Sequence, residues 1–175
     1  MLKLPVNKAS AISFRVKSRR ARTSSLGKQR SGMTRKEFEI AFPKVMGWIK
    51  QILWAHRAET RTIISKNFKR LPLYFSRAQI EAAKFVVVDR VPMPPLSSIG
   101  LSRFSEFERG DYDGITYLDT YFLKRSAAND EMLHFHEMIH IVQLRLFGAE
   151  FFLAMYAGGL ETFGYRNSPL EKMGL

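Results

Sequence analysis

Apolar residues recur at helical spacing in the segment of residues 34–56. This segment reads as a helix, in which a set of apolar residues recurs at intervals of three and one on one face: Val45, Trp48, Ile49, Ile52 and Leu53. Thr34 with Glu37 three positions later is a capping-box pattern and marks the start of the helix. Pro43 is expected to kink or split this helix, because its ring removes a backbone donor.

Helical spacing returns in the C-terminal part of the chain. Residues 129–147 begin with acidic residues, continue with apolar periodicity and stop at Gly148, which predicts a helix. Residues 149–163 predict a second helix of the same kind. Its Gly158-Gly159 pair costs helix stability, which indicates either close packing or a break.

The middle of the chain has the pattern of strands. Residues 85–88 are a β-branched run that ends before a proline cluster, which predicts a buried strand. Residues 114–124 are rich in Thr, Tyr and Phe and predict one or two short strands. Residues 76–84 predict a short helix, residues 93–113 a loop, and residues 57–70 give no clear pattern.

A last short helix is expected near the C-terminus, with Ser168 as its cap and Pro169 as its first residue. The predicted order is therefore helix, helix, strand, strand, helix, helix, without internal repeats. This order favours the α+β class, in which a small sheet packs on helices.

Positive charge is concentrated at the N-terminus. Eleven of the 28 Lys and Arg residues lie in residues 1–36, which hold no Asp or Glu; residues 37–175 hold the other 17 and all 16 acidic residues, so they contribute +1 of the net +12. We expect residues 1–33 to be a disordered basic arm and residues 34–175 to fold. The arm is where nucleic acid or an anionic surface would bind. Met33 is an alternative start of the protein.

Cysteine is absent, which excludes disulfides, cysteine-ligated zinc, iron–sulfur clusters and a cysteine nucleophile. No uncharged apolar run reaches 18 residues, so we expect no transmembrane segment. The chain also lacks the apolar stretch of a secretory signal. Together these absences favour a cytoplasmic protein.

One motif carries chemistry. Residues 136–140 read His-Glu-Met-Ile-His, an H-E-x-x-H sequence inside a predicted helix. A spacing of four places the His136 and His140 imidazoles on one helix face, where two nitrogens can bind one ion. Glu137 lies about 100° further round the helix and can reach a bound water without ligating the ion. Zinc lowers the pKa of such a water, and the glutamate takes its proton as general base.

The chain resembles the zincin metallopeptidase superfamily over about residues 84–175, in the segments FVVVDRVPMPP, GITYLDTYF, FHEMIHIVQ and GYRNSPLEKMG. These segments together are similar to a family of small bacterial zincin-like proteins. The resemblance implies a minimal zincin-like domain over residues 34–175, in which a small sheet packs on the active-site helix and further helices flank it. It also implies one Zn²⁺ ion and a peptide or protein substrate.

The resemblance further implies a third metal ligand, often glutamate, from the helix that follows the motif. Glu171 is similar to the Glu-x-x-Ala element of the glutamate zincins, although Gly174 stands where alanine is expected. The other interpretation of Glu171 is a capping box with Ser168. Glu161 lies close to another zincin spacing and is the alternative ligand; it could also be a solvated carboxylate or a hydrogen-bond partner of a ligand. We favour Glu171.

Four further residues receive weaker predictions. His134 lies on a different helix face from the motif histidines and is expected at the surface or behind the ligands, and His56 is expected to be structural. Tyr165 and Arg166 could stabilise an oxyanion or anchor the turn, so neither is assigned a role. The segment GITYLDTYF could offer an edge strand to an extended peptide or form an ordinary core strand.

Two functions follow from these patterns. The first is a zinc-dependent metallohydrolase, preferentially a peptidase, with His136, His140 and Glu171 on the metal and Glu137 as general base. The second is a non-catalytic zinc-binding or protein-interaction module on the same fold.

Overall fold

Residues 32–174 are described by a computed structural model of the chain. They form a mixed helix and sheet structure, compatible with the predicted α+β class. The basic arm predicted over residues 1–33 lies almost wholly outside the described residues, as does the nucleic-acid contact assigned to it. Within residues 32–174, no helix combines the length and the apolar content that crossing a bilayer requires.

The secondary structure alternates helices, strands and short 3₁₀ turns. The α-helices are α1 (Arg35–Ala55), α2 (Arg77–Ala82), α3 (Ser105–Glu108), α4 (Glu131–Phe147), α5 (Ala149–Phe163) and α6 (Pro169–Lys172). The strands are β1 (Arg61–Thr62), β2 (Lys84–Val88), β3 (Gly114–Tyr117) and β4 (Thr120–Lys124). The 3₁₀ turns are Arg57–Glu59, Ile63–Lys66, Leu71–Leu73, Ser102–Phe104, Arg125–Ala127 and Tyr165–Asn167.

Helix α1 starts as its sequence predicts. The Thr34 side chain accepts a hydrogen bond from the Glu37 amide, and the Glu37 carboxylate accepts one from the Thr34 amide, so the capping box is confirmed. The prediction of a split at Pro43 is wrong, because the helix continues through this residue. Apolar residues on both sides of Pro43, including Ala41 and Ile49, are buried in the core and hold the two halves in one helix.

The sheet has the strand order β1-β2-β4-β3. Strands β3 and β4 form an antiparallel hairpin, so the segment 114–124 provides two strands, and β4 pairs parallel to β2. Strand β1 pairs antiparallel with β2 inside the segment 57–70, where two residues are too few to give a sequence pattern. The hairpin leaves β3 at one edge of the sheet.

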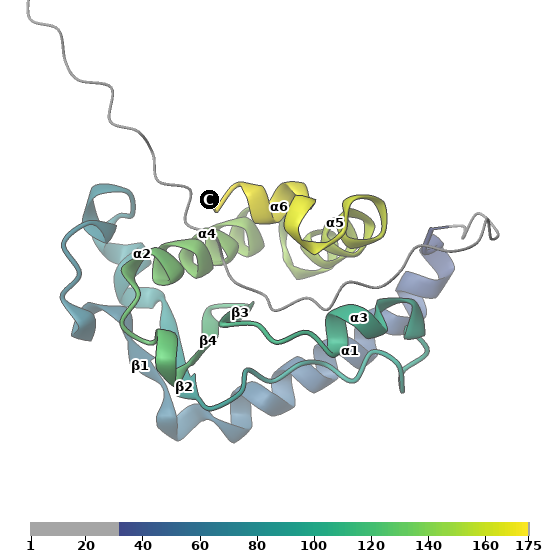
Figure 1. Cartoon of the computed structure of the whole chain (residues 1–175), viewed down its shortest axis with the longest axis horizontal. Helices are drawn as coiled ribbons and strands as arrows, with labels where there is room; N and C mark the ends of the chain where they lie inside the picture. Colours follow the sequence, from purple (N-terminus) through teal and green to yellow (C-terminus); the bar gives the residue numbers. More distant parts are fainter. Residues whose placement is uncertain (1–31, 175) are drawn as a thin grey trace, which may run out of the picture.

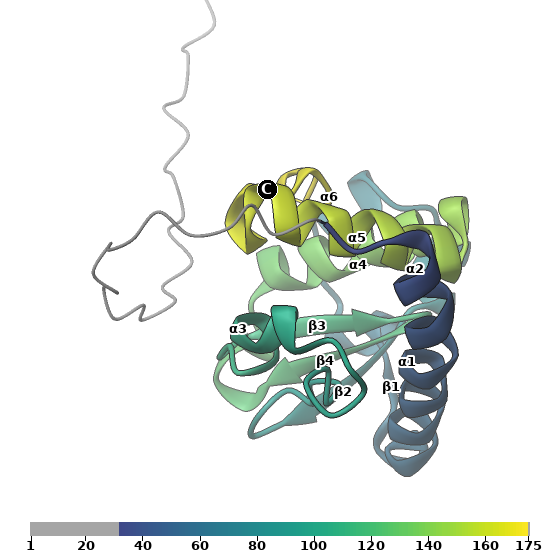
Figure 2. The ribbon, with the colours of Figure 1, turned by 90° about the vertical axis from the view of Figure 1, so that its right-hand side faces the viewer.

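Alternation along the strands divides the core between two faces of the sheet. On one face Phe85 and Tyr121 pack against α4 through Met138. On the other face Phe122 packs with Ile49 of α1. Figure 1 shows the resulting layers, with α4 above the sheet and α1 below it, and Figure 2 shows them from the side.

The C-terminal helices pack closely because α5 carries a glycine where it meets α6. A Cβ atom on Gly159 would lie 2.6 Å from the Ser168 Oγ atom and 3.7 Å from Pro169, whereas one on Gly158 would meet nothing within 4 Å. The glycine pair therefore serves close packing, and α5 is not broken there.

We expect alanine substitutions at these neighbouring glycines to have opposite effects. Gly158→Ala should raise the free energy of unfolding by about 0.5–1 kcal/mol, because alanine favours the helix. Gly159→Ala should instead lower it by about 1 kcal/mol, since the new methyl group must displace Ser168. Urea unfolding of both variants measures the difference, and equal gains would contradict the close packing of α5 on α6.

Candidate metal centre

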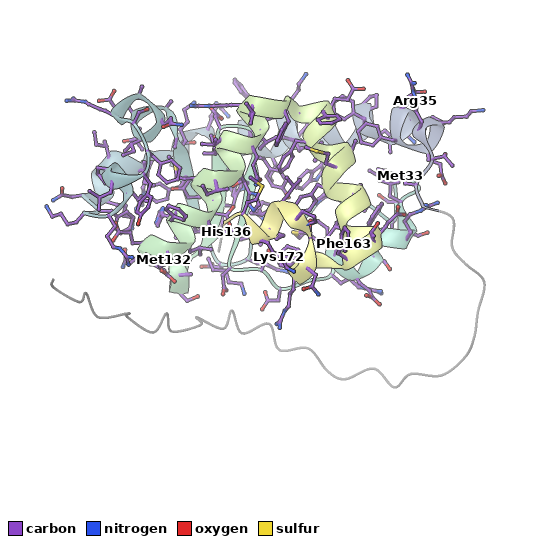
Figure 3. All side chains as sticks on the ribbon, turned by 90° about the horizontal axis from the view of Figure 1, so that it is seen from above. Met33, Arg35, Met132, His136, Phe163 and Lys172 are labelled. Carbon is purple, nitrogen blue, oxygen red and sulfur yellow. The ribbon has the colours of Figure 1, made fainter. Side chains whose placement is uncertain are left out.

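The two motif histidines lie one turn apart on α4 and are both buried. Their Nε2 atoms are 3.0 Å apart, and their ring planes are inclined at 89° to each other. Helix α4 is held in this place by its packing on the sheet and by the Asp130 cap, whose carboxylate accepts hydrogen bonds from the Met132 and Leu133 amides. Figure 3 shows His136 between α4 and the C-terminal α6, on which Lys172 is labelled.

Helix α6 brings the Glu171 carboxylate to the same point. Its Oε2 atom lies 3.2 Å from His136 Nε2, and its Oε1 atom lies 3.5 Å from His140 Nε2. The three residues are buried and offer ligand atoms within 4.8 Å of one another, so they could hold a metal ion. The capping-box interpretation of Glu171 is wrong, because the Ser168 side chain makes no capping hydrogen bond and its buried Oγ has no partner among the described residues.

Hydrogen bonds behind the rings fix which nitrogen of each histidine carries the proton. Gln143 donates its Nε2 to the Leu170 carbonyl, so its Oε1 atom accepts from His140 Nδ1 at 2.8 Å. His136 Nδ1 lies 3.3 Å from the Gly174 carbonyl oxygen, which can only accept. When the rings are neutral, both Nε2 atoms therefore present a lone pair to the triad, as metal-binding histidines require.

Three electron-pair donors consequently converge in a buried space. A tetrahedral zinc ion with bonds of about 2.0–2.1 Å separates its ligand atoms by about 3.3 Å. The two Nε2 atoms are 3.0 Å apart, and each lies near a different oxygen of Glu171, His136 at 3.2 Å from Oε2 and His140 at 3.5 Å from Oε1. The donor set of two imidazoles and one carboxylate is also one that zinc accepts, with a fourth position left for water.

The short helix α6 is fixed despite its place near the chain end. Its Leu170 side chain is buried, and the Leu170 carbonyl accepts the Gln143 hydrogen bond at 3.1 Å. The Tyr156 hydroxyl donates to Glu171 Oε1 at 2.6 Å. Gly174 lies directly against the His136 ring, where any Cβ atom would collide with Nδ1. This contact explains why glycine occupies the position at which the resemblance leads one to expect alanine.

Charge is balanced inside the triad. Burial by itself would raise the pKa of Glu171, but hydrogen bonds and attraction from the two histidines hold it well below its usual range. Burial would lower the pKa of His140, and the hydrogen bond and attraction from Glu171 outweigh this effect and raise it to about 9. The triad thus attracts positive charge, either a proton or a cation.

Glu137 lies beside the triad and is not part of it. Its buried carboxylate accepts a hydrogen bond of 2.6 Å from the Thr116 hydroxyl of β3. Gly114 on the same strand leaves room for it, since a Cβ atom there would collide with Glu137 Oε1. Burial raises the pKa of Glu137, although the histidines and Thr116 act in the opposite direction.

Other residues considered in the sequence are placed elsewhere. Glu161 accepts hydrogen bonds from the Met33 amide at 2.7 Å and from Arg103 at 3.1 Å, and it is not in the triad. His134 is fully buried and contacts the Tyr121 hydroxyl and the Ala128 carbonyl, so the prediction of a surface position is wrong. Burial lowers the pKa of His134 to about 4, which keeps it neutral in the core.

The sequence patterns missed three supporting residues: Gln143, Tyr156 and Thr116. Gln143 lies three positions after His140, where a helix places side chains side by side, so its spacing was a usable signal. Tyr156 and Thr116 come from elements distant in sequence, and no local pattern indicates them. Tyr165 lies against the same site, and burial followed by the charge of Glu171 raises its pKa. Arg166 is exposed.

Comparison with protein-family models, with curated proteins and with solved structures finds no match to this chain.

Removing the proposed third ligand should abolish tight metal binding. We expect Glu171→Ala to weaken zinc affinity by more than about 100-fold. Losing a residue that only hydrogen-bonds to a metal ligand typically weakens affinity by about 10–100-fold, and losing a ligand itself should cost more. Glu161→Ala is the matched control and should leave the affinity unchanged. Competition with a chromophoric chelator measures both, and a loss in Glu161→Ala alone would contradict the assignment.

A methyl group on Gly174 should displace the His136 ring and so weaken metal binding. Gly174→Ala must move the His136 ring or the C-terminal turn, and we expect zinc affinity to fall by about 10–100-fold. Lys172→Ala, on the exposed side of the same turn, should have no effect. The same chelator competition serves as the measurement, and an unchanged affinity in Gly174→Ala would show that this contact does not position His136.

Proposed function

We propose that the protein is a zinc-dependent hydrolase that cleaves peptide bonds, with a glutamate-zincin type of site. The observation that carries the proposal is the convergence of three buried donors, whose ligand atoms lie within 4.8 Å of one another, beside a fourth side chain that can act as a base. His136, His140 and Glu171 would hold the ion. Bound zinc would supply a Lewis acid that lowers the pKa of water and polarises a carbonyl group.

Glu137 would act as the general base. Its carboxylate takes a proton from the attacking water, and the same proton is passed to the leaving nitrogen as the C–N bond breaks. Burial favours the neutral form of this side chain and so makes it a stronger base than an exposed glutamate. The hydrogen bond from Thr116 keeps the carboxylate oriented during both proton transfers.

Strand β3 would position the substrate. It is the edge strand of the sheet, and main-chain pairing along such an edge is a common way to bind an extended peptide. Because Thr116 on this strand also contacts Glu137, a peptide bound along β3 would lie next to the base. Tyr165 stays protonated, since its pKa is raised, and can donate a hydrogen bond to an oxygen that gains charge.

The proposal is tested by separating metal binding from hydrolysis. Glu137→Gln preserves the shape of the side chain but removes its basicity, so we expect zinc content to stay the same and hydrolysis to fall by about 10²–10⁴-fold. Zinc analysis and a pool of quenched fluorescent peptides give the two readouts, with the wild-type full chain as reference.

Three results would count against this function. A wild-type chain that binds one zinc ion but cleaves no peptide of the pool would favour the non-catalytic module instead. A Glu137→Gln variant that hydrolyses as fast as the wild type would remove the base from its role. Absence of zinc binding would overturn the proposal altogether.

A further inference from the structure

An apolar chamber opens beside the candidate metal centre. Helices α1 and α5, the edge strand β3 and the segment of residues 94–107, which includes the start of α3, form its walls. Three side chains of the site, Glu137, His140 and Glu171, face into it at one side. The catalytic proposal also uses β3 and Tyr165, but it assigns no role to the apolar side chains of α1 and α5.

Two long helices line the chamber with matching stripes of side chains. The α1 stripe is Phe38, Ala41, Phe42, Val45, Met46 and Ile49. The α5 stripe has the same spacing of three and one from Ala149 to Leu160. Each stripe spans 11 residue steps and therefore about 16 Å at the rise of an α-helix. Figure 2 shows α5 lying across the top of the molecule and α1 running down one side.

The chamber walls provide few hydrogen-bond partners for a polar ligand. Among the described residues that line the chamber, the charged or titratable side chains other than tyrosines are Glu137, His140 and Glu171. The hydroxyl groups of Thr116 and Tyr156 are engaged with these glutamates, and the Tyr117 hydroxyl donates to the Pro92 carbonyl at 2.7 Å. The two other tyrosines of the lining, Tyr112 and Tyr165, belong to the end of the chamber next to the site, where burial and then the charge of Glu171 raise the pKa of each. A charged or amide group placed away from the site would lose water without gaining a partner.

This lack of hydrogen-bond partners argues against a peptide as the ligand that fills the chamber. An extended peptide rises about 3.3 Å per residue, so about five residues would span 16 Å. Their amide groups could pair with β3, which is four residues long, but not with the apolar stripes of α1 and α5. A hydrocarbon chain has no such groups to satisfy, and it would cover the half-buried faces of Phe38, Met46 and Leu153.

We propose that the chamber binds an unbranched aliphatic chain. Building on the proposed function, this chain belongs to the substrate and is attached next to the bond that the site cleaves, as in an N-acylated peptide. The amide portion then lies along β3 beside the triad, and the chain extends between α1 and α5.

The binding step can be tested without catalysis. The zinc-loaded full chain carrying Glu137→Gln is titrated with a dansylated undecanoic acid, which is then displaced by N-acylglycine amides of increasing chain length. We expect affinity to rise about fourfold for each added methylene group and to level off once the chain exceeds the length of the chamber. An acetylated, amidated tetrapeptide of leucine and phenylalanine serves as the peptide competitor.

A matched pair of variants locates the binding site. Ala157 belongs to the α5 stripe and Ala154 does not, although both are half-buried on the same helix. Ala157→Trp should fill the chamber and reduce affinity for a twelve-carbon chain by at least tenfold, while Ala154→Trp should leave it unchanged. Met46→Gln keeps the side-chain size and should weaken binding severalfold by making the wall polar. Zinc content reports that each variant is folded.

Several outcomes would overturn the proposal: affinity that does not depend on chain length, equal binding by the two tryptophan variants, or displacement by the tetrapeptide at least as strong as by the acyl chains. These readouts need no hydrolysis. A chamber that binds chains while the wild type cleaves nothing would therefore refute the hydrolase alone, and peptide cleavage without chain binding would refute the chamber alone.

Discussion

The site depends on one electrostatic constraint: two imidazole lone pairs and a carboxylate are held against one another in a buried space. Without positive charge between them, these groups repel one another, and burial makes the repulsion stronger. The arrangement is stable only because hydrogen bonds from behind fix each donor, through Gln143 and the Gly174 carbonyl for the histidines and Tyr156 for Glu171. These partners orient the donors before any ion binds, which reduces the reorganisation that binding requires.

The same contacts explain how a helix of four residues can carry a ligand. An isolated helical turn of this length is unstable, so α6 is held in its conformation by its contacts with α4 and α5. Gln143 connects the two by bonding His140 on one side and the Leu170 carbonyl on the other. Gly159 and Gly174 permit the approach by leaving out side chains at the two closest points. The candidate metal centre and the packing of the C-terminal helices therefore depend on the same contacts.

Local patterns predicted the long elements well, because capping and apolar periodicity are properties of short segments. The helix around His136, its partner helix and the buried strand at residues 85–88 all agree with the structure. The patterns were less reliable where tertiary contacts determine the local structure. Helix α1 continues through Pro43, and the Ser168 side chain makes no capping hydrogen bond. Glu171 could be favoured over Glu161 only through a resemblance, since nothing local separates two glutamates on neighbouring helices. Tyr156 and Thr116 meet the site from distant elements, and such meetings have no signal in one sequence.

Strand β3 connects the three parts of the proposed function. It is an edge strand of the sheet, its Thr116 hydroxyl donates to the Glu137 carboxylate, and its residues form one wall of the apolar chamber. Helix α1 contributes no residue to the triad or to its hydrogen bonds, and its stripe only lines the chamber, whereas the α5 stripe includes Tyr156, whose hydroxyl donates to Glu171. Under the proposed function, substitutions on α1 would therefore change which substrate binds without moving the three side chains of the candidate metal centre.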